Sequence, residues 1–264
     1  MAEHLYICDH LSLLRPGVDT TLGLARASRA AGFGTCWGLM SDLVCREDGV
    51  WVEAHPFDGE HVVEAGSLRP ISEFAVTFVR TDPPVDREYL AGLWLLDVAA
   101  RAGCTVVNDP ATLTWANEKT LILYFPDLIP PTRVTNSVVE LQAMIEAVGA
   151  IVLKPLDGNG GRGVLVASAE DGNTSSMLEM STEDGRRQVM AQAYLPEVRA
   201  GDRRVLLVDG EALAVLNRVA PAGEHRSNMH VGAAWEWVPL DADDRRICSA
   251  VGPFFRRHGL RFVG

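Results

Sequence analysis

Cysteine and histidine are sparse and show no arrangement typical of a metal site. The five cysteines are scattered and include no CxxC pair, and the seven histidines form no HExxH motif. An odd number of isolated cysteines, most of them beside apolar residues, predicts buried free thiols rather than a disulfide framework or a zinc site. The five are Cys8, Cys36, Cys45, Cys104 and Cys248.

Long apolar runs and an excess of positive charge are missing as well. No apolar run approaches the roughly 20 residues of a membrane-spanning helix, and Met1–His4 lack the basic start of a secretory signal. The net charge of −11 argues against nucleic acid or an anionic membrane as the main partner. With 47% hydrophobic and 22% charged residues, the composition is that of an ordinary globular protein, and we expect a cytoplasmic one.

The first part of the chain alternates predicted strands and helices. Helices are predicted over Thr20–Ala31 and Glu88–Ala102, each followed by a glycine that can end it. Asp48 and Gly49 predict a tight turn within a hairpin over Val44–Val52. This alternation favours a mostly parallel sheet covered by helices on both faces. The predicted strands are Leu5–Cys8, Thr35–Leu39, Phe74–Arg80 and Thr105–Asn108.

Strand-like segments dominate the second part, which follows a proline-rich stretch at residues 126–131. A helix is predicted over Val138–Ala147, and an amphipathic helix over Asp241–His258. We therefore expect an α/β half followed by an α+β half, with a boundary within Ala111–Lys119. Strands are predicted near Val134 and over Ala150–Leu153, Gly163–Ala167, Val189–Ala193, Arg204–Val208, Glu211–Asn217 and Leu260–Val263.

A glycine-rich loop after the predicted strand at 150–153 carries the strongest functional signal. Lys154 can supply a positive charge there, and bare glycine backbone can approach phosphate oxygens closely. Gly158, Gly160 and Gly163 fit the GxGxxG pattern, but a dinucleotide-binding fold needs a helix after the loop. Val164–Ala167 is predicted to be a strand instead, and no GxxxxGK[ST] motif is present. We expect a loop that covers a nucleotide; the alternative is an ordinary glycine-rich hairpin turn.

A second hairpin is predicted around an Asp-Gly turn further along the chain. Counting back from that turn places Arg204 opposite Val215. It also places Asp202 opposite Asn217, beside Arg218. Two arginines and an acid should therefore gather at the open end of this hairpin; the alternative is a surface ion-pair cluster.

Several motifs in a fixed order resemble those of the bacterial glutathione synthetases. Lys154–Gly161 nearly repeats that family's Lys-Pro-Leu-Asp-Gly-Met-Gly-Gly run, and Arg80–Asp86 resembles its Arg-Lys-Asp-Pro-Pro-Phe-Asp segment. The motifs cover most of residues 74–264, whereas the preceding residues match only in pattern. Together they are much more specific than any one of them. The others are Asn117–Lys119, Phe125–Thr132, Gln192–Pro196, Gly201–Arg204 and Val208–Glu211.

The resemblance implies an ATP-grasp enzyme that joins γ-glutamylcysteine to glycine through an acyl phosphate, using ATP and Mg²⁺ in the cytoplasm. It implies an α/β pre-ATP-grasp domain over residues 1–115 and an α+β ATP-grasp domain over 116–264, with a lid over about 120–200. It also suggests a homo-oligomer. Because a carboxylate and a triphosphate are both anions, such a site must surround the transferred phosphoryl group with cations.

The resemblance also assigns roles to single residues. The alternative for Lys119 and for Lys154 is that each is an ordinary surface lysine. A nucleotide is expected at Lys119, Lys154, Gly158, Gly160, Gly161, Gln192, Tyr194, Leu195 and Asp202. Arg204 and Arg218 are the expected catalytic residues, and Arg80, Arg226 and Asn228 the expected substrate-binding residues.

Two regions depart from the family pattern. The long segment Val219–Ala234 corresponds to a mobile loop that shields the acyl phosphate, yet Gly232–Trp235 replaces a Gly-Gly-Arg-Gly stretch, and Thr81 replaces a lysine. After Gly264 the family continues through an acid and a Glu-x-Asn segment that hold magnesium. We therefore expect no metal ligand in this sequence, impaired catalysis, and a gene fragment or truncated record.

Three functions stay open from the sequence. The first is glutathione synthetase, or a fragment of one. The second is an ATP-grasp ligase for another carboxylate and amine, which the changed loop favours. The third is a nucleotide-binding fragment without catalysis, which the missing metal ligands favour.

Overall fold

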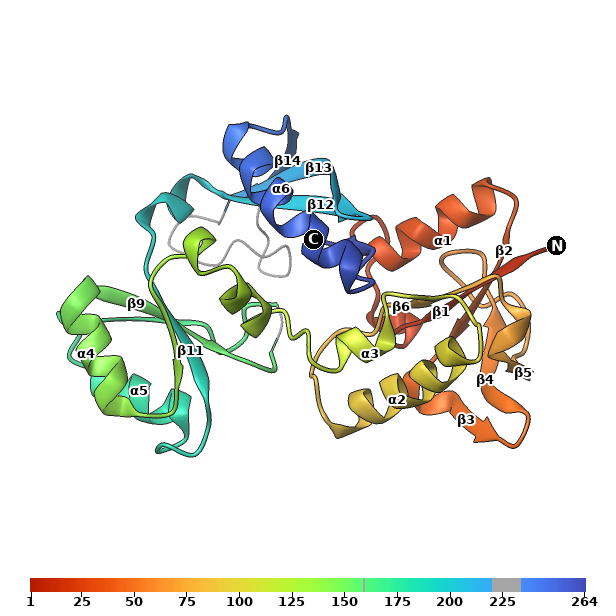
Figure 1. Cartoon of the computed structure of the whole chain (residues 1–264), viewed down its shortest axis with the longest axis horizontal. Coiled ribbons are helices and arrows are strands. Elements are labelled where there is room, and N and C mark those ends of the chain that lie inside the picture. The colour runs from red at the N-terminus through yellow and green to blue at the C-terminus, as the bar shows by residue number, and fades with distance from the viewer. Residues whose placement is uncertain (159, 220–233) are drawn as a thin grey trace. The chain divides into compact units, whose positions relative to one another are not determined.

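The computed structural model describes residues 1–158, 160–219 and 234–264 and divides the chain into two compact units. The first unit comprises Met1–Trp115 and Phe254–Phe262, and the second Ala116–Pro253 and Val263–Gly264 (Figure 1). Each unit has its own sheet and its own cluster of buried apolar side chains.

The sheet of the first unit has the order β3-β4-β2-β1-β6-β7, with β5 paired to β4. Strands β2, β1, β6 and β7 run parallel to one another, whereas β4 pairs antiparallel with β2, β3 and β5. The strands are β1 (Glu3–Ile7), β2 (Gly34–Gly38), β3 (Leu43–Arg46), β4 (Gly49–Pro56), β5 (Ser67–Pro70), β6 (Val76–Val79) and β7 (Val106–Val107). The helices are α1 (Thr20–Ala30), α2 (Arg87–Arg101) and α3 (Pro110–Leu113), with short 3₁₀ turns at Leu11–Leu13, Met40–Asp42 and Ile71–Glu73.

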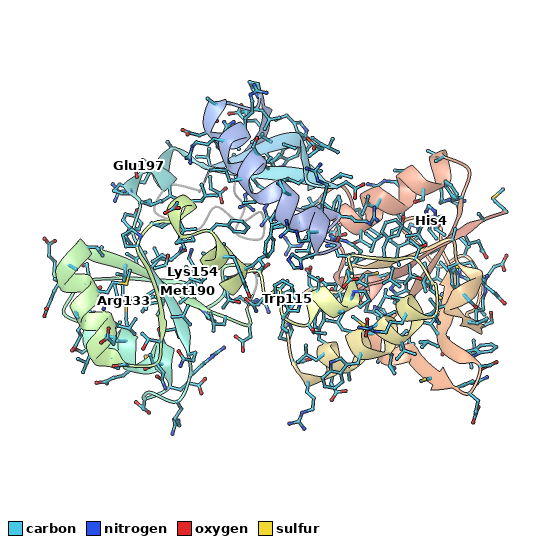
Figure 2. All side chains as sticks on the ribbon, viewed as in Figure 1. His4, Trp115, Arg133, Lys154, Met190 and Glu197 are labelled. Carbon is cyan, nitrogen blue, oxygen red and sulfur yellow. The ribbon has the colours of Figure 1, made fainter. Side chains whose placement is uncertain are left out.

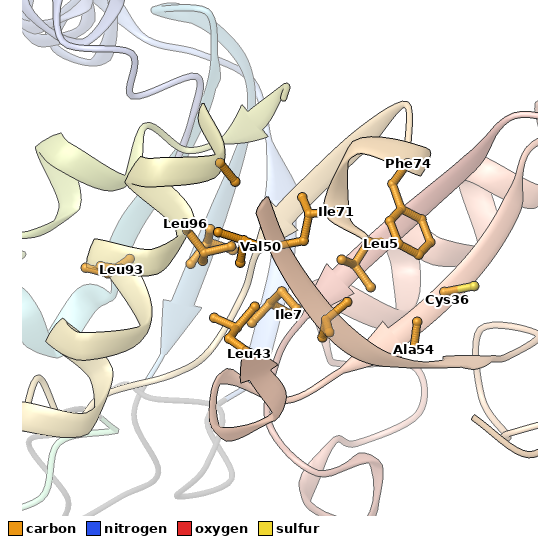
Figure 3. Packing of buried hydrophobic residues seen from close by; sticks show 13 residues of the cluster. Leu5, Ile7, Cys36, Leu43, Val50, Ala54, Ile71, Phe74, Leu93 and Leu96 are labelled. Atoms are coloured by element: carbon orange, nitrogen blue, oxygen red, sulfur yellow. The ribbon is translucent and has the colours of Figure 1, made fainter. Parts of the chain in front are cut away.

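Side-chain alternation along β1 explains why helices cover both faces of this sheet. Leu5 and Ile7 pack in one cluster with Leu93 and Leu96 of α2 (Figure 3). Tyr6, which points to the opposite face, packs in another cluster with α1. The predicted α/β arrangement is thereby confirmed.

The first predicted hairpin is present, but its turn lies one residue earlier than predicted. Arg46 pairs with Gly49, so Glu47 and Asp48 form the two-residue connection. Gly49 has a φ of +134° and is the first residue of β4. The prediction that Asp48 and Gly49 form the turn was therefore wrong, because the positive φ is needed just after the connection rather than inside it.

The second unit contains the antiparallel sheet β10-β9-β11-β8 and the antiparallel strands β14, β13 and β12 of a sheet with the order β14-β13-β12-β15. Helices α4 and α5 pack on the first of these through the cluster that contains Leu141, Ile151 and Leu178. The strands are β8 (Thr132–Thr135), β9 (Ala150–Pro155), β10 (Leu165–Ser168), β11 (Val189–Ala193), β12 (Asp202–Val208), β13 (Glu211–Val219), β14 (Ala234–Val238) and β15 (Phe262–Val263). The helices are α4 (Val138–Val148), α5 (Thr174–Thr182) and α6 (Ala242–Arg257), with 3₁₀ turns at Thr120–Tyr124, Pro126–Leu128 and Pro196–Ala200.

The register of the β12–β13 hairpin differs from the prediction. Val208 pairs with Glu211 as expected, but an irregularity between Leu206 and Leu207 leaves Leu213 as an extra residue on β13. As a result Arg204 lies opposite Leu216, not Val215, and Asp202 lies opposite Arg218, not Asn217. A bulge shifts every pair beyond it by one position, and counting from the turn could not show it.

Within the three described ranges, no helix has the length and apolar composition needed to cross a membrane.

Candidate functional site

The glycine-rich loop of the second unit connects β9 to β10, which pair antiparallel, so the predicted strand-to-strand setting is confirmed. Gly160, Gly161 and Gly163 have φ values of +62°, +76° and +69°, which side chains rarely allow. A Cβ on Gly163 would lie 2.8 Å from Cγ of Pro155. The loop therefore needs glycine, and the same lack of side chains leaves its backbone open to a ligand.

Lys154 lies on β9 just before this loop, directly opposite Met190 of β11 (Figure 2). Its Nζ donates a hydrogen bond of 2.5 Å to Oε1 of Gln192, and Nε2 of Gln192 donates one of 3.0 Å to Oγ1 of Thr132. Burial lowers the pKa of Lys154, and the charge of Lys119 lowers it further. Among the residues that the structure describes, no carboxylate forms an ion pair with Lys154. A half-buried cation of this kind is well placed to hold an anion.

Lys119 is brought to the same loop by the Asn-Glu-Lys segment. Nδ2 of Asn117 donates a hydrogen bond of 2.9 Å to the carbonyl oxygen of Leu156, and Nζ of Lys119 donates one of 3.3 Å to that of Gly158. Lys119 also forms an ion pair with Glu118. Lys119 and Lys154 are the only two lysines in the sequence, and both lie at this loop.

The end of β11 and the residues after it form the segment that the resemblance assigns to the nucleotide. The backbone N–H groups of Ala193 and Tyr194 donate to the carbonyl oxygens of Pro131 and Ala150, over 2.9 Å and 3.0 Å. Leu195 follows with an exposed side chain. Gln192 is thus placed on the same sheet as Lys154, and Tyr194 and Leu195 directly follow its strand.

Asp202, Arg204 and Arg218 lie on one face of the second sheet, because residues directly opposite each other in a ladder point the same way. Arg218 is only 8% exposed and donates hydrogen bonds of 2.8 Å and 2.5 Å to the two carboxylate oxygens of Asp202. Burial and the charge of Arg218 lower the pKa of Arg204, against the charges of Asp202 and Glu118. Arg204 has no ion pair with a described carboxylate, so its positive charge is available to a ligand.

The remaining predicted residues are the three expected to bind substrate, Arg80, Arg226 and Asn228. Arg80 belongs to the first unit, where it donates hydrogen bonds of 2.7 Å to Oγ1 of Thr20 and 3.3 Å to Oγ1 of Thr21. Arg226 and Asn228 lie outside the described residues, as does most of the predicted long loop, residues 220–233.

Two contacts at the loop were missed from the sequence. Arg187 donates a hydrogen bond of 2.5 Å to Oδ1 of Asp157 and so ties the loop to the start of β11. Thr132 orients the amide of Gln192. Thr132 lies in a matched motif, which was a usable signal, whereas Arg187 carries no local signature.

The described residues include no group of three or more His, Cys, Asp or Glu side chains that could hold a metal ion. The acids beside the lysines and arginines of this site are already engaged, Asp202 with Arg218 and Glu118 with Lys119. The described part of the site therefore fits a polyphosphate but does not by itself fit Mg²⁺.

Family models match nearly the whole chain. The prokaryotic glutathione synthetase N-terminal domain matches residues 3–114, and the prokaryotic glutathione synthetase ATP-grasp domain matches residues 118–264. The chain belongs to the prokaryotic glutathione synthetase family. It is 41% identical over 264 residues to a glutathione synthetase of Parasynechococcus marenigrum, covering 99% of this chain and 86% of the relative. The glutathione synthetase of Agrobacterium fabrum is 37% identical over 262 residues, covering 97% of this chain and 82% of that protein.

Solved structures with the same fold are ATP-grasp ligases. D-cycloserine synthetase DcsG has a TM-score of 0.65 at 16% identity, over 98% of this chain and 83% of that one. The ligase PsnB, complexed with a minimal precursor, Mg and ADP, has a TM-score of 0.60 at 17% identity, over 98% and 82%. These likenesses show the fold, and together with the family they make this chain an ATP-dependent ligase of the glutathione synthetase family.

Proposed function

We propose that this chain is a glutathione synthetase, which joins γ-glutamylcysteine to glycine and converts ATP to ADP and phosphate. The observation that carries the proposal is the convergence of Lys119 and half-buried Lys154 on a glycine loop between two strands. The relatives that share the chain's family are named glutathione synthetases, and the chain covers most of their length.

The proposed reaction has two steps. The γ-phosphoryl group passes to the cysteinyl carboxylate, which gives ADP and an acyl phosphate. The glycine amine then attacks the carbonyl carbon, phosphate leaves with the C–O bond electrons, and the amine proton is released. Both steps concentrate negative charge, so their activation free energies are lower where fixed cations are already in place.

We assign the phosphate contacts to Lys119, Lys154 and the backbone of the loop at 158–163. Gln192, Tyr194, Leu195 and Asp202 are proposed to line the rest of the nucleotide site. Arg204 is proposed to contact the transferred phosphoryl group or the carboxylate. Arg218 would act beside it, held by its two hydrogen bonds to Asp202. Arg80, Arg226 and Asn228 remain proposed substrate contacts.

The proposal includes Mg²⁺ as the cofactor and the cytoplasm as the compartment, as the family resemblance implies. Mg²⁺ would neutralise phosphate charge when bound. A homo-oligomer is proposed on the same ground; light scattering coupled to gel filtration would measure the assembly mass.

Coupled ADP release tests the proposed reaction. We expect ADP and glutathione in equal amounts when γ-glutamylcysteine, glycine, ATP and Mg²⁺ are all present, and neither product when one amino-acid substrate is omitted. ATP binding without turnover of any substrate pair would contradict the proposal and favour a non-catalytic nucleotide-binding chain.

A second candidate function is ligation of another carboxylate and amine. Trp235 lies directly opposite Arg218, so both belong to the same sheet face, and Trp237 follows on that face. Their side chains are 47% and 65% exposed. Bulky aromatic groups therefore stand beside the proposed reaction centre, in the region where the family's Gly-Gly-Arg-Gly stretch is replaced. ADP release with a different substrate pair, but not with γ-glutamylcysteine and glycine, would favour this candidate.

A further inference from the structure

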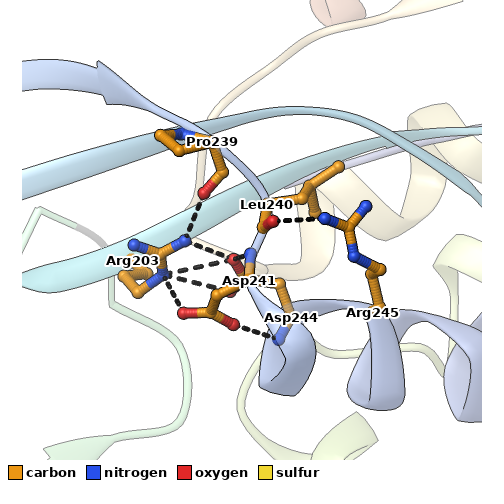
Figure 4. A network of polar contacts seen from close by, with 6 residues as sticks. All are labelled: Arg203, Pro239, Leu240, Asp241, Asp244 and Arg245. Carbon is orange, nitrogen blue, oxygen red and sulfur yellow. Dashed lines mark hydrogen bonds and ion pairs between the residues drawn. The ribbon is translucent and has the colours of Figure 1, made fainter.

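Arg203 makes a dense set of contacts on the face of β12 opposite to Asp202 and Arg204 (Figure 4). Its Nε donates to both carboxylate oxygens of Asp244, at 3.2 Å each, and its Nη2 also donates to Asp244. Nη2 donates a further hydrogen bond of 2.8 Å to the carbonyl oxygen of Pro239, and Nε lies 3.3 Å from Oδ2 of Asp241. One side chain thus ties β12 to the end of β14 and the start of α6.

The acceptors of these bonds are themselves fixed. The backbone N–H of Asp244 donates a hydrogen bond of 2.8 Å to Oδ1 of Asp241, and the N–H of Asp241 donates one of 3.0 Å to Oδ2 of Asp244. This reciprocal arrangement is a capping box at the start of α6. Asp244 is only 6% exposed, so its carboxylate has little freedom to follow a displaced partner. Arg203 is therefore held against a rigid helix start.

The open end of β12 needs such an anchor. The tight turn sets the pairing of Val208 and Leu207 with β13. The irregularity between Leu206 and Leu207 then interrupts the ladder on the side of Arg204. Because side chains alternate along a strand, fixing Arg203 on one face fixes the directions of both its neighbours on the other.

We propose that Arg203 is a positioning residue, which by its contacts with Asp244 and Pro239 aims Arg204 at the reacting groups. Arg203 itself touches neither nucleotide nor substrate. The inference rests on the function proposed for Arg204, so it concerns the rate of the chemical step rather than nucleotide affinity.

Kinetics of Arg203→Gln and Asp244→Asn test the proposal with the full chain at a temperature where both variants are folded. We expect kcat to fall about tenfold or more in each, while the Kd of ATP changes by less than about threefold. The double variant should lose no more than either single one, because both break the same contact. Arg203→Lys, which keeps the charge but not the forked geometry, should recover part of the loss.

Arg246→Gln is the matched control, because it removes an arginine from the same end of α6 whose ion pair within the described residues is with exposed Asp243, at 3.3 Å. Its kcat should stay unchanged. An unchanged kcat in Arg203→Gln, or equal losses in the control, would overturn the proposal. If Arg203→Gln does not fold, Arg203→Lys and Asp244→Asn test the proposal instead. A wild-type kcat in both of these variants would overturn the proposal.

Hydrogen exchange separates this proposal from the proposed function. Arg203→Gln should speed amide exchange over residues 202–206 and leave β9–β11 protected, whatever reaction the chain catalyses. Absence of glutathione synthesis by the wild-type chain would refute the function alone. Unchanged exchange over residues 202–206 would refute the anchoring by Arg203.

Discussion

At the scale of single residues, Lys154 owes its proposed role to its surroundings. It is half-buried, it is close to a second lysine, and among the described residues its side-chain hydrogen bond goes to the neutral amide of Gln192. Such a cation is destabilised until an anion arrives, so binding of a polyphosphate should be the event that relieves it.

Lys154→Ala should therefore weaken ATP binding by about tenfold or more, or about 1.4 kcal/mol, as measured by titration calorimetry. Arg133→Ala removes a charge from β8 of the same sheet, where Arg133 pairs with Glu140 at 3.0 Å (Figure 2). That control should leave the affinity unchanged. Equal affinities for Lys154→Ala and the wild type would remove Lys154 from the phosphate site.

Gly163 illustrates a residue required by geometry alone. Its φ of +69° and the 2.8 Å contact that a Cβ would make with Pro155 predict that Gly163→Ala destabilises the loop by about 1–2 kcal/mol. Gly172→Ala is the control, because a Cβ there would meet nothing within 4 Å. Urea unfolding and ATP titration of both variants would check the difference; similar losses in the two would contradict it.

At the scale of elements, local signals predicted most helices and strands, and long-range contacts decided the rest. The β9–β10 connection could be predicted because glycines and flanking apolar residues are adjacent in sequence. Helix α5 was missed because its sequence, TSSMLEMST, is rich in Ser and Thr and buries only Leu178 and Thr182. The bulge at Leu213 was missed because an extra strand residue leaves no mark on the turn. The contact between Arg203 and Asp244 joins residues 41 positions apart, and no local pattern encodes it.

Asp244 should stabilise the start of α6 in a pH-dependent way. The hydrogen bonds from Arg203 lower the pKa of Asp244, so the folded state favours its charged form. This contribution is present above the unfolded pKa of about 3.8 and is lost as the pH falls through the lower folded value.

Asp244→Asn should accordingly cost about 1–3 kcal/mol of unfolding free energy near about pH 7, and less near about pH 3. Urea unfolding of both proteins at the two pH values measures this. Asp243→Asn, which alters an exposed acid of the same turn, is the control. A cost that does not shrink in acid would contradict the assignment.

At the scale of the whole molecule, the first unit is built from segments far apart in the sequence. Phe254–Phe262 belongs to the first unit, although the rest of that unit ends at Trp115. Asn108 joins the two segments. Its Nδ2 donates a hydrogen bond of 2.9 Å to the carbonyl oxygen of Phe262, and its Oδ1 accepts one of 2.8 Å from the N–H of Phe262. The side-chain amide of Asn108 thus forms with the backbone of Phe262 the pair of hydrogen bonds that a neighbouring strand residue would form.

Asn108→Ala should loosen the segment 254–262 and destabilise the first unit by about 1–3 kcal/mol, since two hydrogen bonds are lost. Hydrogen exchange over residues 254–262 should rise. Asn173→Ala removes an amide that makes no side-chain cap, and it should have little effect. Unchanged exchange in Asn108→Ala would show that other contacts hold the segment.

The placement of both lysines at one loop has a practical chemical consequence. An amine-selective acylating reagent can react with this chain only at the amino terminus and at the proposed nucleotide site. The lowered pKa of Lys154 leaves more of its amine as the unprotonated nucleophile than an ordinary lysine would have, whereas a bound polyphosphate would cover it and keep it charged. The extent of lysine labelling thus becomes a direct gauge of how many molecules in a preparation carry a nucleotide.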